Sequence, residues 1–408
     1  MNMAVNEDLL VPENPLPVVR VPMHSRKTLV AYELQFQNNS LDDEEVRLNT
    51  LNAITDGSLS RLTAANRTYM KLSDDILLSE IDPFKHAPHL GIVITPEIAT
   101  NPKLVSRVNT LAFHNRQFLL DLGEYSVFSN SNVEQLLTFV RAVRIDVGTL
   151  SRQRLLETID YLIDRSIDVY LTGVDDRDTY AYVESLPVKA IQGHYLLKPE
   201  VINIRALGAS KLSLLRLIGS VQEKALDPVS LGKIVSDDAM LSYKLLGVVN
   251  SSYFNLQKTM RSVEQAAIFL GTMRMKNWIF TMALIGRSEA PAELLRASLV
   301  RARLMERMTS HMTQAELDMA YTVGILSLLD VMLGADLRFL IEHLPLMAPI
   351  TDCLLDNKGP YIKYLAMICN WEKGQGANGD DSTLSKRMAA AYQEALVWAD
   401  NVYAEATH

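Results

Sequence analysis

Residues 118–174 read FLLDLGEYSVFSNSNVEQLLTFVRAVRIDVGTLSRQRLLETIDYLIDRSIDVYLTGV. In this stretch, short apolar runs alternate with longer segments whose apolar residues recur every three or four positions. The runs are 118–123, 142–147 and 168–174, and the longer segments are 131–141 and 151–166. The runs predict buried strands and the longer segments predict amphipathic helices. Because strands that alternate with helices usually run parallel, this stretch predicts a β/α fold.

The same alternation extends in both directions, from about Val18 to about Pro199. Further strand candidates are 18–23, 28–36, 89–96 and 189–197. Several of the predicted strands end in a polar residue, and in a β/α barrel such strand ends converge on the face that carries the functional groups. The strand-end residues are Glu33, Asp121, Asp146, Thr172 with Asp175, and Gln192. We therefore expect the site of this half at these positions.

After about Ile204 the pattern becomes almost continuously helical, which predicts an all-α region. The chain has 408 residues, more than the roughly 250 to 300 that one hydrophobic core usually holds. We therefore expect two domains after a flexible, proline-containing leader. The predicted boundaries are 1–17 for the leader, 18–204 for the α/β barrel domain and 205–408 for the helical domain.

Composition limits the class of partner. The net charge is −8, which argues against broad attraction to a nucleic-acid backbone. Neither a secretory signal nor a run of about 18 apolar residues is found, so we expect a cytoplasmic protein that does not insert into membranes. The two cysteines, Cys353 and Cys369, lack the neighbours of a zinc site and are expected to be reduced thiols.

Eight short motifs occur in a characteristic order. They are AYELQFQ at 31–37, LDLG at 120–123, RID at 144–146, TGVDD at 172–176, QGHYLLKP at 192–199, SDDAMLSYKLLGVVNSSYF at 236–254, SVEQAAIFLG at 262–271 and GILSLLDVML at 324–333. In this order the chain resembles the EAL–HDOD family, in which a cyclic-di-GMP phosphodiesterase domain precedes an HDOD domain. The resemblance implies a degenerate, shortened TIM-type barrel followed by a helical domain related to the HD phosphohydrolases.

The resemblance also implies what each barrel position does. Active EAL domains hydrolyse the dinucleotide with two divalent metals held by several carboxylates. Glu33 matches the signature Glu and Asp121 the second Asp of a family motif, whereas other positions have lost the family residue. Leu120, Val93, Lys71 and Thr172 replace metal-site residues, Arg144 replaces the catalytic Lys, and Asp175 replaces a Glu. The resemblance therefore implies no metal, no cofactor and no catalysis, with Asp146 and Gln192 as further remnants.

The helical half resembles a hydrolase that has lost its His-Asp pair, because Ser327 and Leu328 stand where that pair is expected. Its motif positions are expected to be structural or to bind a partner. They are Asp237, Asp238, Leu241, Ser242, Asn250, Ser251, Gly271 and Ser327.

Two basic groups have alternative interpretations. Lys71 and Arg144 could hold a phosphate, although structural ion pairs with Glu33 or Asp121 are favoured. Arginines at 296, 303 and 307 form a stripe that could touch an acidic partner or nucleic acid, although a solvated helix face is favoured. Likewise, six methionines between 273 and 312 could form an adaptable groove, but core filling is favoured.

Three functions remain open. The favoured one is a non-catalytic bacterial signalling protein that acts through unidentified protein partners, in the control of motility, pili or biofilm. The first alternative is a cyclic-di-GMP receptor that does not hydrolyse its ligand. The second is a residual phosphodiesterase, which would need replacements for the ligands lost at 71, 93, 120 and 172.

Overall fold

The computed structural model describes residues 15–26, 28–37, 44–79, 87–128, 130–197, 218–219, 221, 226–250, 259–287, 290–376 and 382–407. The described residues fall into two compact units: 15–197 with 371–376, and those between 218 and 370 with 382–407. The predicted boundary at 204 and most of the predicted leader lie outside the described residues. The first strand begins at Val18, and Leu16, just before it, is 1% exposed and packs in the barrel's core.

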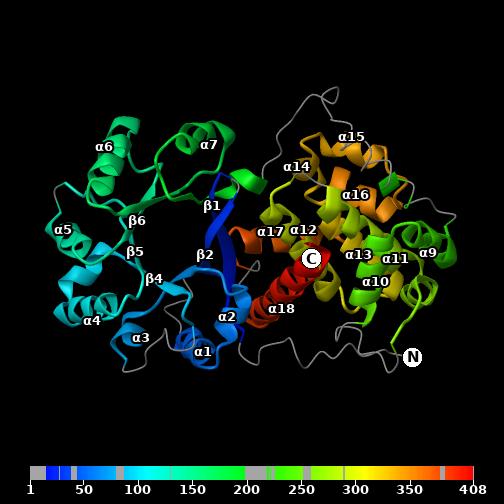
Figure 1. Cartoon of the computed structure of the whole chain (residues 1–408), viewed down its shortest axis with the longest axis horizontal. Helices are drawn as coiled ribbons and strands as arrows, with labels where there is room; N and C mark the ends of the chain where they lie inside the picture. The colour runs from blue at the N-terminus through cyan, green and yellow to red at the C-terminus, as the bar shows by residue number, and fades with distance from the viewer. Residues whose placement is uncertain are drawn as a thin grey trace. The chain divides into compact units, whose positions relative to one another are not determined.

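Eight strands form a closed barrel in chain order (Figure 1). They are β1 (Val18–Ser25), β2 (Thr28–Phe36), β3 (Thr68–Lys71), β4 (Leu90–Ile94), β5 (Phe118–Asp121), β6 (Ala142–Asp146), β7 (Asp168–Thr172) and β8 (Ala190–Ile191). Strands β2 to β8 are parallel, as predicted. Strand β1 is antiparallel to β2 and β8, because a two-residue turn, with Arg26 at φ 46°, reverses the chain between β1 and β2. The prediction missed β3, which has only four residues.

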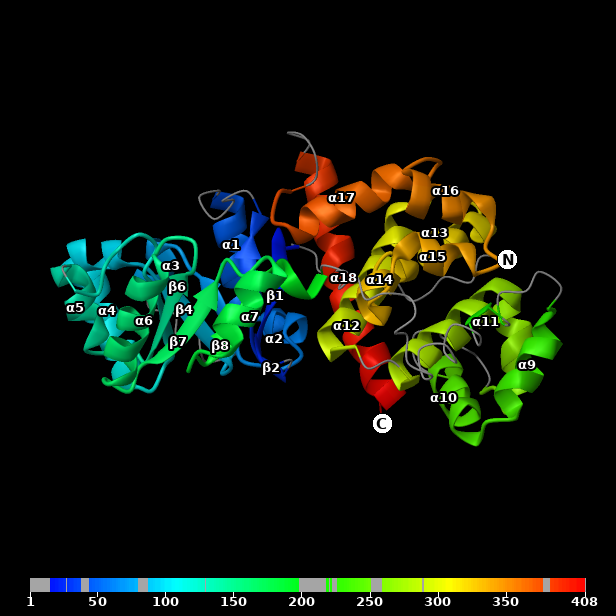
Figure 2. The ribbon, with the colours of Figure 1, turned by 90° about the horizontal axis from the view of Figure 1, so that it is seen from above.

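Short helices follow the strands and cover the outside of the barrel (Figures 1 and 2). They are α1 (Glu44–Thr55), α2 (Ser58–Leu62), α3 (Asp74–Leu78), η3 (Pro96–Thr100), α4 (Pro102–Phe113), α5 (Ser131–Leu137), α6 (Arg152–Ile163), α7 (Arg177–Glu184) and η4 (His194–Leu197). An outer core of apolar residues fills the space between these helices and the strands. This layered packing is the usual one for a β/α barrel.

A second, smaller core fills the barrel interior. It contains Met23, Ala31, Tyr69, Val93, Leu119, Ala142, Tyr170 and Ala190. The rings of Tyr69 and Tyr170 meet edge to face, with their centroids 5.8 Å apart. A Cβ atom on Gly91 would lie 2.5 Å from the Tyr69 ring, so only glycine leaves room for this packing. The interior is therefore a packed core below the mouth of the barrel.

The second unit is helical, as predicted. Its helices are α9 (Pro228–Ser236), α10 (Ala239–Asn250), α11 (Val263–Arg287), α12 (Ala292–Met308), α13 (Gln314–Leu326), α14 (Leu329–Leu333), α15 (Leu337–Glu342), α16 (Ala348–Asp356), α17 (Ile362–Glu372) and α18 (Ser382–Thr407). Within the described part of the chain, none of the helices has the length and apolar character needed to cross a membrane.

The methionines of the helical unit fill its core. Met275, Met282, Met305 and Met308 are at most 5% exposed, whereas Met273 and Met312 are half-buried. Core filling, the favoured interpretation of the methionine-rich stretch, is thus confirmed for these four residues.

Candidate functional site

The carboxyl ends of the barrel strands bring seven side chains to one mouth. Alternate residues of a strand face the same side, and the residues two positions earlier on these strands lie in the barrel interior or against its Tyr69 ring. The side chains at the mouth therefore point toward the barrel axis, and we call them the mouth ring. The mouth ring consists of Glu33, Lys71, Val93, Asp121, Arg144, Thr172 and Gln192.

Arg144 is the centre of the mouth ring. Its Nη1 donates to Oε1 of Glu33 at 2.6 Å, and its Nη2 donates to Oδ2 of Asp121. The side chains of Arg144 and Glu33 are 12% and 6% exposed, and that of Asp121 is 27% exposed. One guanidinium, on β6, thus bridges the carboxylates of Glu33 on β2 and Asp121 on β5, a geometry suited to its planar fork. Arg144 forms both of the ion pairs favoured from sequence.

Both carboxylate oxygens of Glu33 accept hydrogen bonds. Its Oε2 accepts hydrogen bonds from Nε2 of Gln192 at 2.7 Å and from Nε2 of Gln35 at 2.8 Å. Gln192 is 4% exposed, so this bond is shielded from water. The sequence prediction missed Gln35, although its place two residues after Glu33 on the same strand face could have indicated it.

The charges of this network favour a permanently ionised arginine. Burial lowers the pKa of the Arg144 guanidinium, but the charges of Glu33 and Asp121 and their hydrogen bonds raise it, and the net pKa lies above its ordinary value. A buried carboxylate is tolerated only when it is paired and hydrogen-bonded. Arg144 therefore supplies the positive charge that a bound cation would supply in a metal-dependent barrel.

The residues of the mouth ring do not fit the two-metal site of active EAL domains. Val93 offers no donor atom and is 3% exposed in the inner core, while Lys71 brings a positive charge. Both oxygens of Glu33 are engaged. Over the residues described, no cluster of three or more His, Cys, Asp or Glu side chains could hold a metal ion. We therefore derive no metal-dependent step from this site.

The position of Leu120 corrects one prediction. Leu120 is fully buried in the outer core, between the strands and the helices, whereas Asp121 faces the axis and binds Arg144. A carboxylate at position 120 would thus point away from the mouth. The ring position of β5 is Asp121, so the ring has kept two acidic residues, Glu33 and Asp121.

The remaining predicted acids bond to nearby loops. Oδ1 of Asp146 accepts from the backbone N–H of Gly148 at 2.8 Å and closes its own turn. Oδ1 of Asp175 accepts from the backbone N–H of His194 at 2.8 Å and lies 3.0 Å from Nδ1 of the same residue. These two acids therefore shape the loops at the rim of the mouth.

The predicted motif residues between α9 and α11 stabilise the ends of these helices and the loops between them. Asp237 ends α9, and Oδ1 of Asp238 accepts from the backbone N–H of Leu241 at the start of α10. Oγ of Ser242 donates to the Val235 carbonyl at 3.0 Å, which ties α10 to α9. The half-buried Leu241 packs against the core formed by α9, α10 and α11.

Three more motif positions also have local roles. The side-chain amide of Asn250 binds both the N–H and the C=O of Met260, at 2.6 and 2.9 Å, while Ser251 lies outside the described residues. Gly271 has φ 75° and interrupts the helical geometry of α11. Oγ of Ser327 donates to the Gly324 carbonyl at 2.7 Å and accepts from Nη1 of Arg301 at 3.2 Å.

The arginine stripe of α12 corrects another prediction. Arg303 is 2% exposed, and it and Arg307 donate to the buried carboxylate of Glu394 on α18. Arg296 pairs with Asp400, also on α18, at 3.3 Å. The stripe is neither a solvated face nor a surface for nucleic acid, because a second helix with matching acids covers it.

Comparisons with known proteins match part of the helical half to one domain family and most of the chain to two relatives. A match to the HDOD domain family covers residues 211–333. The uncharacterized protein YuxH of Bacillus subtilis is 23% identical over 94% of this chain and 98% of its own length. The cyclic di-GMP phosphodiesterase CdgJ of Vibrio cholerae is 25% identical over 84% of this chain and 82% of its own length.

Among solved structures, the similar ones align with less than half of the chain. The Klebsiella pneumoniae BlrP1 complex with calcium and cyclic di-GMP is 12% identical over 45% of this chain and 56% of that chain, with a TM-score of 0.37. The FimX EAL domain of Pseudomonas aeruginosa bound to cyclic di-GMP is 16% identical over 45% of this chain and 90% of that chain, with a TM-score of 0.36.

Proposed function

The chain belongs to the proteins that join an EAL-like barrel to an HDOD domain, and from this premise we propose that it is a non-catalytic signalling protein of the cyclic-di-GMP network. It acts through protein partners, in the control of bacterial surface behaviour such as motility, pili or biofilm. One observation carries the proposal: the guanidinium of Arg144 binds both surviving carboxylates of the mouth ring, Glu33 and Asp121.

Metal-dependent hydrolysis of a phosphodiester needs carboxylates that are free to bind cations and to hold water. Here a cation would have to displace Arg144 from two ion pairs and Gln192 and Gln35 from the second oxygen of Glu33. At the neighbouring ring position, Val93 could offer that cation no ligand in return. The network thus supports a barrel that keeps its shape without a metal.

Hydrolysis is the second candidate, because the relative CdgJ is named as a cyclic di-GMP phosphodiesterase. The charges of the mouth ring also affect whether cyclic di-GMP can bind. The charges of Glu33 and Asp121 balance those of Arg144 and Lys71, and Arg144 is already paired with both acids. The two phosphates would therefore find no net positive charge at the mouth, so we rank both hydrolysis and tight dinucleotide binding below the proposed role.

The test uses the purified full-length protein with cyclic di-GMP and either MgCl2 or MnCl2. We expect no linear dinucleotide product by chromatography and no heat of binding by calorimetry at high micromolar ligand. A triple variant with Val93→Glu, Lys71→Asn and Arg144→Lys, which returns family-type residues to the ring, is the matched comparison. We expect it to bind Mn²⁺ measurably better than the wild type does.

Product formed by the wild type, and lost in Glu33→Gln, would establish a phosphodiesterase and overturn the proposal. Binding without product would establish a receptor instead. Equal Mn²⁺ binding by the wild type and the triple variant would show that Arg144 does not block the cation site.

A further inference from the structure

Basic residues collect at the end of the barrel opposite the mouth. The parallel strands all begin at this end, and β1, which is antiparallel, finishes there. The residue directly before the strand is basic at β3, β6 and β8 and is histidine at β4, Arg116 lies two residues before β5, and Arg26 directly follows β1. These residues are Arg26, Arg67, His89, Arg116, Arg141 and Lys189. We call this surface the basic N-terminal face.

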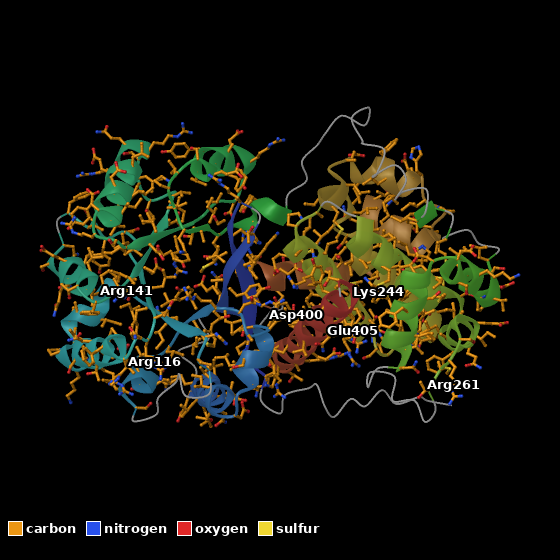
Figure 3. All side chains as sticks on the ribbon, in the orientation of Figure 1. Arg116, Arg141, Lys244, Arg261, Asp400 and Glu405 are labelled. Carbon is orange, nitrogen blue, oxygen red and sulfur yellow. The ribbon has the colours of Figure 1, made fainter. Side chains whose placement is uncertain are left out.

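Most of this charge reaches solvent. Arg26, Arg67, Arg141 and Lys189 are exposed, and Arg116 is half-buried; Figure 3 labels Arg116 and Arg141 on this unit. Strand β7 supplies an acid instead, Asp168, which lies 3.6 Å from Nζ of Lys189. The opposite end differs in sign, because acids follow the strands there. They include Asp74, Asp75, Glu97, Asp121, Glu124, Asp146, Asp175 and Asp176.

An apolar side chain projects from the same basic N-terminal face. Phe113 ends α4, three residues before Arg116, and is 87% exposed. Its ring meets the edge of the His114 ring, with centroids 5.8 Å apart. Ile163, at the end of α6, is 39% exposed at this end too. Arginines that share a face with an exposed aromatic ring have the composition of protein–protein binding sites, where aromatic residues and arginine contribute most of the affinity.

We propose that the basic N-terminal face docks an acidic, partly apolar polypeptide segment of a partner protein; this inference rests on the proposed function and gives the partner its chemistry. A protein partner fits better than nucleic acid or an anionic membrane. The whole chain carries a net charge of −8, which repels an extended anionic surface at long range. A short acidic segment contacts only the positive charge of the basic N-terminal face and not the negative remainder of the chain, and its apolar residues cover Phe113.

The probe is a fluorescein-labelled peptide of about 20 residues, composed of Glu and Leu in helical spacing so that one face is apolar. Fluorescence anisotropy with the full-length protein is expected to show binding that weakens as salt rises. The double variant Arg26→Glu with Arg141→Glu should weaken binding at least about tenfold at low salt, and Phe113→Ser should weaken it about threefold.

The matched control reverses two charges at the other end of the barrel, Lys103→Glu with Arg177→Glu, at the starts of α4 and α7. It has the same net charge as the double variant and should change binding less than about twofold. Equal losses in both double variants would reduce the effect to net charge and overturn the proposal. Thermal melting checks folding, and Arg141→Gln replaces the double variant if that variant unfolds.

Three further results would also overturn it: no binding of the acidic peptide, tighter binding to vesicles of about 30% phosphatidylserine or to duplex DNA than to the peptide, or salt-sensitive self-association that the double variant abolishes. The last would mean that a second copy of the chain occupies the face. These outcomes are independent of the hydrolysis assay, so the docking surface and the proposed function can fail separately.

Discussion

The barrel and the helical unit each bury a network of arginines and carboxylates, with opposite proportions. At the barrel mouth one guanidinium, Arg144, serves two carboxylates. Between α12 and α18 one buried carboxylate, Glu394, serves two guanidiniums, Arg303 at 2.7 Å and Arg307 at 2.9 Å, and Arg303 also pairs with the more exposed Glu306 on its own helix. In each network one central ion, Arg144 or Glu394, binds two ions of the opposite charge.

The pKa directions express this difference. Burial raises the pKa of the Glu394 carboxyl, but the charge of Arg303 and the hydrogen bonds and charge of Arg307 lower it below its ordinary value. At the mouth the two acids act in the reverse sense and raise the pKa of Arg144. A buried ion pair contributes little net stability, but its disruption costs much. Each network should therefore depend most on its central ion, Arg144 at the mouth and Glu394 between α12 and α18.

The largest effect is expected from Glu394→Ala. The change leaves Arg303, which is 2% exposed, without its buried carboxylate, and it should lower the free energy of unfolding by about 3–5 kcal/mol. Urea unfolding followed by tryptophan fluorescence is a suitable measurement, because Trp278 and Trp398 lie in the helical unit. Glu157→Ala, which breaks an exposed pair with Arg154, should change the free energy of unfolding far less, because water and salt screen that pair.

The pH dependence of Glu394 has a defined sign. Its pKa is lowered on folding, so its contribution is present above the unfolded value of about 4.3 and is lost as pH falls through the folded value. The stability difference between wild type and Glu394→Ala should therefore be constant near neutral pH and shrink below about pH 4. A difference that stayed constant down to pH 3 would contradict the ion-pair account.

The second effect concerns the barrel mouth. Arg144→Ala leaves Glu33 and Asp121 facing each other without a cation, and it should destabilise the barrel by about 2–4 kcal/mol. Adding Glu33→Gln and Asp121→Asn removes the unpaired charges and should recover more than half of this loss. Thermal unfolding of the four combinations gives the coupling energy. Additive losses would mean that Arg144 acts through packing and not through the two carboxylates.

Sequence patterns predicted much of this fold because its signals are local. The alternation within 118–174 depends on neighbouring residues, and all three strands and both helices predicted there are present. Strand β3 was missed because four residues are too few to show a period of two. The antiparallel β1 follows from a two-residue turn that the spacing between 18–23 and 28–36 only partly revealed.

The site was predicted in position but not in full. The strand-end rule placed Glu33, Asp121 and Gln192 at one mouth, and the structure brings them together. The motif resemblance misassigned Leu120, because a motif fixes the order of residues but not which side of the strand each one faces. The prediction that the arginines of α12 form a solvated face was wrong for a related reason. The acids that cover them lie about 90 residues later in the chain, beyond the reach of any local pattern.

The smallest effect is expected at Asp318, a half-buried carboxylate that lacks a close guanidinium. Asp318 lies 3.6 Å from Nε of Arg274 and accepts from Nε2 of Gln314 at 3.0 Å. Burial raises its pKa above the ordinary value, and the charge of Arg274 only partly offsets this. A raised pKa favours folding below the unfolded value of about 3.9, and this contribution is lost as pH rises through the folded value. The ionised carboxylate is thus a net cost at neutral pH.

Asp318→Asn keeps an oxygen that can accept from Gln314 and removes the buried charge. We expect it to stabilise the protein by about 1 kcal/mol at pH 7, and the gain should vanish near pH 4, where the wild-type carboxyl also becomes neutral. Thermal unfolding of both proteins at the two pH values measures this difference. Destabilisation at pH 7 would show that Arg274 pairs with Asp318 as effectively as Arg303 and Arg307 pair with Glu394, and that the number of close guanidiniums does not decide the cost of a buried carboxylate here.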